Sequence, residues 1–111
     1  MRATNTESTN LMILYNVTVK IKNEVKDDWL KWMREIHIPD MMATNLFIDN
    51  KLLRIFDEDT DGTTYAIQYF CKDMETFQAY QGKHAKALQK DHSERYGKHY
   101  VAFRTLMEVI A

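Results

Sequence analysis

The sequence predicts one α+β domain in which four antiparallel strands form a single sheet and two helices cover one of its faces, in the order βαββαβ. Four segments carry the β-branched and aromatic residues typical of strands. Two segments between them repeat apolar residues every three or four positions, as amphipathic helices do. The 111 residues, 45% of them hydrophobic, are enough for one core but not for two.

The first strand is predicted over residues 11–21, where apolar and polar residues alternate. A helix follows, and Asn23 is suited to cap its N-terminus. Pro39 lacks an N–H group and disfavours helical geometry in the residue before it. We therefore expect the helix to end near His37, with a short further turn through Met42.

A β-hairpin is predicted next. Residues 46–56 resume an extended pattern and residues 63–71, TTYAIQYFC, repeat it. The segment 57–62 between them, DEDTDG, has the composition of a turn. The two strands should therefore be adjacent and antiparallel.

The second helix is predicted to begin at Asp73, to weaken near Gly82 and to stop at Gly97, and the last strand covers 99–110. Two right-handed crossovers then place both helices on one face of the sheet. The strand order becomes 4-1-3-2, which is the ferredoxin-like sandwich.

Alternation divides the side chains of the sheet between two faces. The face assigned to the helices holds Tyr15, Val17, Val19, Leu53, Ile55, Tyr65, Ile67, Tyr69, Val101, Phe103 and Val109. The opposite face holds Leu14, Asn16, Thr18, Leu52, Arg54, Phe56, Thr64, Ala66, Gln68, Phe70, Ala102, Arg104, Leu106 and Glu108. This second face is too apolar to lie bare in water, so we expect a homodimer in which two sheets enclose a shared barrel.

Composition argues against several classes of partner. The net charge of −1 leaves no excess of basic residues for nucleic acid, and no apolar run approaches the length of about 20 residues that spans a membrane. The single cysteine, Cys71, fits a reducing compartment, and residues 1–10 lack the apolar core of a signal peptide. We expect a cytoplasmic protein with a flexible extension over 1–10 and one domain over 11–111.

No motif indicates a metal or a cofactor. There is no C-x-x-C pair, no glycine-rich phosphate loop and no pair of histidines four residues apart. We therefore expect the protein to bind no metal and no cofactor.

Candidate functional residues are polar side chains placed on otherwise apolar faces. Two histidines and a tyrosine near the helix faces are candidate acid/base groups: His37, His84 and Tyr80. Each also has a purely structural interpretation. An inward arginine needs a carboxylate partner or an anionic ligand. The candidate ligand contacts are Asn16, Trp29, Arg54, Gln68 and Arg104.

Four segments together resemble a family of uncharacterised bacterial proteins: Y-N-V-T-V at 15–19, W-L-K-W-M with H-I-P at 29–39, M-A-T-N-L-F at 42–47 and A-F-R-T-L at 102–106. The resemblance covers nearly everything after Met12. It implies a dimeric α/β-barrel fold without an assigned activity, and its recurrent positions would be Trp29, His37, Pro39, Phe103 and Arg104.

The wider group of dimeric α/β-barrel proteins includes cofactor-independent monooxygenases and haem-degrading enzymes. Their pocket uses an asparagine on the first strand and a tryptophan and a histidine on the second helix. Asn16, Tyr80 and either His84 or His92 are loosely similar. The chain departs from the pattern because Tyr80 replaces the tryptophan and Asn16 is predicted to point away from the helices.

Three functions remain open from the sequence. The first is a homodimeric small-molecule-binding domain, with or without cofactor-independent catalysis on a small polar aromatic or anionic compound. It predicts a pocket of a few hundred Å³, on the order of known ligand sites, in the cleft between helices and sheet. The others are a non-catalytic dimerisation or ligand-sensing module, and a haem-binding or monooxygenase-like enzyme. The interior of the dimer barrel is the rival location for the pocket.

Overall fold

The structure is a computed structural model that describes residues 11–111, so the predicted extension over residues 1–10 lies outside the described residues. The strands are β1 (Ile13–Lys22), β2 (Asp49–Ile55), β3 (Gly62–Cys71) and β4 (Tyr100–Glu108). The helical elements are η1 (Asn23–Val25), α2 (Lys26–Trp32), η2 (Met33–His37), α3 (Ile38–Ala43), α4 (Met74–Lys83), α5 (Ala85–Tyr96) and η3 (Gly97–His99).

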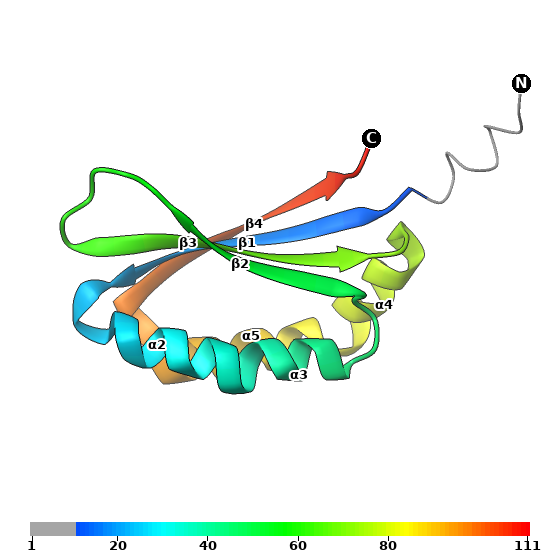
Figure 1. The fold of residues 1–111 in the computed structure, drawn as a ribbon. Helices are drawn as coiled ribbons and strands as arrows, with labels where there is room; N and C mark the ends of the chain where they lie inside the picture. The colour runs from blue at the N-terminus through cyan, green and yellow to red at the C-terminus, as the bar shows by residue number, and fades with distance from the viewer. Residues whose placement is uncertain (1–10) are drawn as a thin grey trace, which may run out of the picture.

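The four strands form one antiparallel sheet in the order β2-β3-β1-β4, which confirms the predicted topology. Figure 1 shows the helices on one side of this sheet, and among residues 11–111 no helix covers the other side. The two central strands, β1 and β3, carry most of the buried sheet residues. The structure therefore has a covered face, where the core lies, and an open face.

The predicted faces are correct for β1 and β3 but wrong for the two edge strands. Arg104 pairs with Val17, and Arg54 pairs with Tyr65, so both arginines lie on the covered face. Leu52, Ala102, Leu106 and Glu108 move to that face with them. Each edge strand has apolar residues at both parities, so its own alternation could not fix the register; pairing with the central strands does.

The same correction changes the composition of the open face. Val101 and Phe103, predicted to lie under the helices, are 67% and 63% exposed on the open face. The other large apolar side chains exposed there are Leu53, Ile55 and Met107. Phe56, predicted to belong to the open face, lies just beyond β2 and contacts the Arg54 guanidinium instead, which is 5.1 Å from its ring centroid. The open face therefore holds more large apolar side chains than predicted, and it lacks the two arginines that were assigned to it.

The first helix does not end near His37, as predicted, but continues through Pro39 to Ala43. The turn before the proline is a π-helix, Met33–His37, in which the chain is wound more widely. A wider turn accommodates both the missing N–H group and the bulk of the proline ring. The helix therefore stays continuous, and His37 is held at the end of its π-turn.

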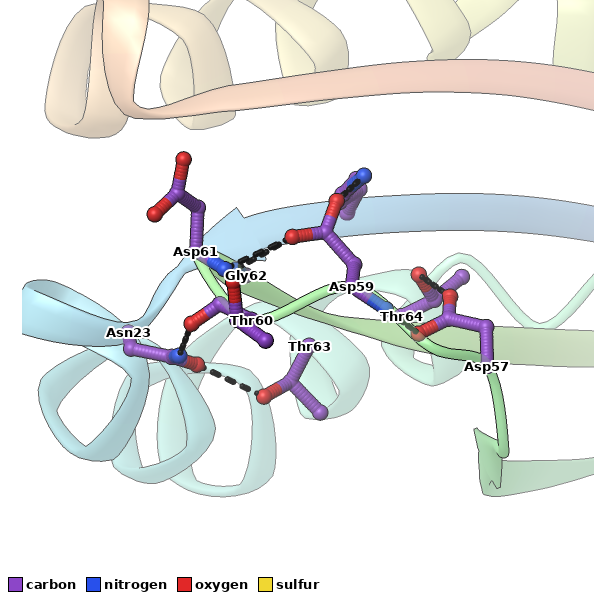
Figure 2. Close-up of polar contacts among 9 residues, drawn as sticks. Asn23, Asp57, Asp59, Thr60, Asp61, Gly62, Thr63 and Thr64 are labelled. Carbon is purple, nitrogen blue, oxygen red and sulfur yellow. Dashed lines mark hydrogen bonds and ion pairs between the residues drawn. The ribbon is translucent and has the colours of Figure 1, made fainter.

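Asn23 does not cap this helix. Its side-chain amide donates to the Thr60 carbonyl at 3.0 Å and its oxygen accepts from the Thr63 hydroxyl at 2.8 Å (Figure 2). The turn between β2 and β3 is held further by Asp59, whose carboxylate accepts from the Asp61 backbone N–H at 2.7 Å. Asn23 thus ties the start of the helix to the hairpin.

The second helix begins as predicted and breaks two residues later than predicted. The Asp73 carboxylate accepts from the Thr76 N–H at 2.8 Å, and Gly97, at φ 46°, ends the helix. The break falls at His84, with φ −127°, rather than at Gly82. It separates α4 from α5, so that the two helices follow different stretches of the sheet (Figure 1).

We expect Asp73→Ala to lower the thermal melting temperature by a few degrees, because it removes the N-cap that satisfies the first turn of α4. Differential scanning calorimetry checks this. Asp73→Asn is the matched control and should retain most of the stability, since asparagine caps helices nearly as well. Equal losses in the two variants would contradict a capping role.

Candidate functional site

Two aromatic clusters fill the space between the covered face and the helices. One consists of Tyr15, Phe47, Tyr69, Phe77 and Tyr80, with centroids 4.9 to 6.4 Å apart in neighbouring pairs. The other consists of Trp29, Trp32, His37, His92, Tyr96 and Tyr100. Two histidines in an aromatic core need hydrogen-bond partners, so the second cluster is the chemically unusual one.

A cavity of about 30 Å³ lies where the two clusters meet. Its lining is mostly apolar but includes two histidines, three tyrosines, a glutamine and an arginine; the residues are Tyr15, Val17, Val19, Met33, His37, Met41, Ile67, Tyr69, Tyr80, Leu88, Gln89, His92, Ala102 and Arg104. The volume is enough for one or two water molecules. The predicted pocket is therefore in the predicted cleft but is much smaller than the few hundred Å³ expected.

His92, on α5, is buried and receives a hydrogen bond from the Trp29 indole, Nε1 to Nε2, at 2.9 Å. Burial lowers the pKa of His92 to about 4, with smaller contributions from the neighbouring His37 and Arg104. The imidazole is therefore neutral at pH 7.

His37 lies near the His92 imidazole and stacks on Trp32, with the ring centroids of His37 and Trp32 4.8 Å apart. Its centroid is 5.7 Å from that of His92. Its Nδ1 atom is buried and has no hydrogen-bond partner among residues 11–111. Burial lowers the pKa of His37, although Asp40 and Asp91 act in the opposite direction, so this ring too favours its neutral form.

Arg104 brings a positive charge to the edge of the cavity from β4. Arg104 is exposed and Gln89 on α5 is half-buried, so the cavity reaches solvent between these two elements. No carboxylate within the described part of the chain forms an ion pair with Arg104. Its charge is therefore available to an anion.

Tyr69 and Tyr80 are the most deeply buried tyrosines, and their hydroxyl groups have few hydrogen-bond partners among the residues described. The Tyr69 hydroxyl is buried without a partner among the residues described, and the Tyr80 hydroxyl donates only to the Met41 sulfur, at 3.5 Å. Burial raises the pKa of both phenols, and Tyr15 raises them further. They stay protonated at neutral pH and are hydrogen-bond donors rather than bases.

The structure thus brings together three of the predicted site residues, His37, Tyr80 and Arg104, around one cavity, and a fourth, Trp29, contacts it through His92. Asn16 and Gln68 lie on the open face, where the Gln68 amide donates to Asn16 at 3.3 Å. They remain candidates for the barrel of a dimer.

Two predicted residues lie away from the cavity. His84 is at the break between α4 and α5, half-buried, where its backbone N–H donates to the Tyr80 carbonyl at 2.9 Å. Arg54 lies over Phe56 in an open groove at the β2 edge. Neither shares the cavity with His37.

Sequence reasoning missed Tyr69 and Gln89 and named His92 only as an alternative to His84. A signal for His92 existed, because it continues the apolar stripe of Tyr80 and Leu88 along the second helix. Nothing local distinguished the two histidines. The break at His84 turns α5 so that His92, rather than His84, meets the first helix.

The cavity does not fit a metal ion or a haem. Within residues 11–111 no group of three or more histidine, cysteine or acidic side chains is arranged to hold a metal. A volume of about 30 Å³ is a small fraction of that of a haem. The haem-binding alternative is therefore not supported by the shape of this site.

No helix in the described range is both long and apolar enough to cross a membrane.

A sequence family described as "Domain of unknown function (DUF4286)" matches residues 12–110. Among curated proteins, none matches this chain in sequence.

Solved structures share the fold. A dimeric ferredoxin-like protein from an uncultured marine organism has a TM-score of 0.67 at 12% identity, over 91% of this chain and 97% of the other. An EthD-like protein from Ralstonia eutropha has a TM-score of 0.67 at 14% identity, over 92% and 95%. SnoaB, a cofactor-independent oxygenase from Streptomyces nogalater, has a TM-score of 0.65 at 12% identity, over 89% and 94%. At these identities the likeness establishes the ferredoxin-like fold alone.

Proposed function

This chain belongs to the DUF4286 family, whose function is unknown, and we propose from its cavity that it is a homodimeric domain that binds and deprotonates a small anionic compound without a cofactor. The observation that carries the proposal is the meeting at one cavity of two neutral histidines with an arginine that forms no ion pair within residues 11–111. A neutral imidazole accepts a proton, and an unpaired guanidinium binds an anion.

The roles follow from the position of each group. Arg104, at the exposed end of the cavity, is the anchor for the anion. His37, with a buried nitrogen that has no partner within residues 11–111, is the candidate proton acceptor. Tyr80 stays protonated and donates a hydrogen bond. A buried polar atom without a partner is costly in a folded protein, which favours a ligand that supplies the missing partner.

The bound ligand requires the cavity to enlarge. Met33 and Met41 line it, and unbranched methionine side chains repack at low cost. Arg104 is on an edge strand and its side chain is exposed, so it can move outward. The cavity is thus lined in part by side chains that can move, Met33, Met41 and Arg104, and in part by aromatic and aliphatic residues of the core.

The homodimer is proposed from the open face. Large apolar side chains are exposed on it along both edge strands: Leu53 and Ile55 on β2, and Val101, Phe103 and Met107 on β4. A second copy presents the same surface, so a two-fold pairing of open faces covers both. One of the solved structures that share this fold is described as dimeric, which supports this arrangement.

Binding is tested by titrating acetate, benzoate and their neutral amides, acetamide and benzamide, into ¹⁵N-labelled protein. At least one of the two anions is expected to shift the side-chain resonances of His37 and His92, with an affinity about tenfold or more above its amide. Arg104→Met should abolish that preference, because the charge-assisted hydrogen bonds are lost.

Arg54→Met is the matched control. Arg54 is also on the covered face but lies in the groove at the other edge of the sheet, so anion binding should be unchanged. If neither anion shifts the two histidines at millimolar concentration, or if the Arg54 and Arg104 variants behave alike, the proposed function is wrong.

The second candidate is a non-catalytic dimerisation or ligand-sensing module. It is favoured by the small volume of the cavity and by the hydrogen bond between Gln68 and Asn16 on the open face, which is placed to fix the register of a dimer. In that case Gln68→Ala weakens the dimer, whereas Arg104→Met leaves it intact and no anion binds. The same titration and a sedimentation experiment separate the two candidates.

A further inference from the structure

The hydrogen bond between Trp29 and His92 determines which nitrogen of His92 carries the proton. The indole Nε1–H is a donor with no acceptor capacity, so at 2.9 Å the Nε2 atom of His92 must accept. A neutral imidazole then has its only proton on Nδ1. His92 can donate from Nδ1 but cannot serve as a base through Nε2.

The ring of His92 is closely surrounded by aromatic side chains. Trp29 is fully buried, and Trp29 and Tyr100 both meet the imidazole edge to face, with centroid distances of 6.3 and 4.2 Å. Trp32 also packs on the ring, at 5.5 Å, but forms no hydrogen bond with it. Among the residues described, Trp29 alone supplies the donor that selects the tautomer.

His37 has the complementary character. Its ring lies 5.7 Å from that of His92, and its buried Nδ1 has no partner in the described part of the chain. When the proton of His37 is on Nε2, this Nδ1 is an acceptor. The hydrogen bond from Trp29 thus fixes the tautomer of His92, whereas no described hydrogen bond fixes that of His37.

We infer that Trp29 is a positioning residue that makes His92 the hydrogen-bond donor of the cavity and leaves His37 as its proton acceptor, and that the substrates are small anionic carbonyl compounds with a C–H group next to the carbonyl. The inference rests on the proposed function and assigns the substrate class of the same site. The anion pairs with Arg104, and the carbonyl oxygen accepts from His92.

The step balances without any other reactant. The C–H bond next to the carbonyl breaks and an N–H bond forms on Nδ1 of His37. The electron pair of the C–H bond becomes the C=C bond of an enolate, and the carbonyl π pair moves to oxygen. That oxygen is stabilised by the Nδ1–H of His92, as in other sites where a donor faces the developing negative charge. Return of a proton to carbon restores the carbonyl compound.

The tautomer is measured by long-range ¹H–¹⁵N correlation of the histidine rings. In the wild type at pH 7, His92 should show a protonated Nδ1 and an unprotonated Nε2. Trp29→Phe should shift the population toward the Nε2–H form. Trp32→Phe removes similar ring volume from another indole that packs on His92 without removing a hydrogen bond to it, so it should leave the tautomer unchanged.

The chemical role is measured by exchange of the methyl protons of pyruvate in D₂O. The wild type should accelerate the exchange, and Trp29→Phe should slow it at least tenfold more than Trp32→Phe does. A wild-type His92 with its proton on Nε2, or equal exchange rates in the two variants, overturns the positioning role. If the wild type binds the anions described above but gives no exchange, the substrate class inferred here is wrong, whereas anion binding at the cavity stands.

Discussion

Phe103→Asp is expected to convert the proposed dimer into a monomer. Phe103 is 63% exposed on the open face, on the edge strand β4, and a two-fold axis places the substitution twice in one interface. A carboxylate buried there would lose its hydration without gaining a partner, at a cost of several kcal/mol for each copy. The dissociation constant should rise on the order of a thousandfold or more. Sedimentation equilibrium measures it directly.

Phe56→Asp is the matched control for this experiment. Phe56 is even more exposed, at 84%, but lies beyond the end of β2 beside Arg54 rather than on the open face. The control should sediment as the wild type does. A wild-type protein that sediments as a monomer at every concentration measured would contradict the open-face interface. So would a Phe103 variant that remains dimeric.

The second large effect is a loss of stability in mild acid. Burial lowers the pKa of His92 to about 4, whereas in the unfolded chain it has the ordinary value near 6.5. Between these values the unfolded state binds the proton and the folded state does not, so stability falls as the pH falls from 6.5 to 4. The expected contribution is about 3 kcal/mol, and it is absent above pH 6.5, where both states are neutral.

Urea denaturation of the wild type, His92→Gln and His84→Gln across this pH range isolates the contribution. The groups that face His92 and share in its titration are His37 and Arg104. In His92→Gln the free energy of unfolding should fall by about 3 kcal/mol less between pH 6.5 and 4 than in the wild type. His84→Gln changes a histidine outside the cavity and should show the same pH dependence as the wild type. Equal slopes in all three proteins would show that His92 is not buried as a neutral ring.

The order of elements and the sheet topology were predictable because they depend on long patterns. The alternation in β1 and β3 continues over ten residues each, and both strands lie under the helices, so one parity is clearly apolar. The edge strands offered no such contrast. In β4 the parity that faces the helices holds Ala102 and Arg104, whereas the opposite parity holds Val101 and Phe103. Apolar residues on the surface proposed to contact a second copy have the same sequence pattern as residues of the core, so the pattern could not distinguish the two faces.

The helix through Pro39 was unpredictable for a related reason. A proline normally ends a helix. Here the π-turn before Pro39 allows the helix to continue, and no pattern of residues predicts such a turn. That continuation also fixes His37 beside Trp32. The residue types His37, Tyr80 and Arg104 could be chosen from the sequence, but their meeting depends on the register of β4 and on the break at His84.

The most direct test of the central claim is a crystal structure of the protein with bound acetate or benzoate. The account predicts two copies paired through their open faces, and in each copy a carboxylate about 3 Å from the Arg104 guanidinium, in the enlarged cavity between α5 and β4 beside His37 and His92. An anion bound instead between the two sheets, against Asn16 and Gln68, with the cavity between helices and sheet unchanged, would contradict it.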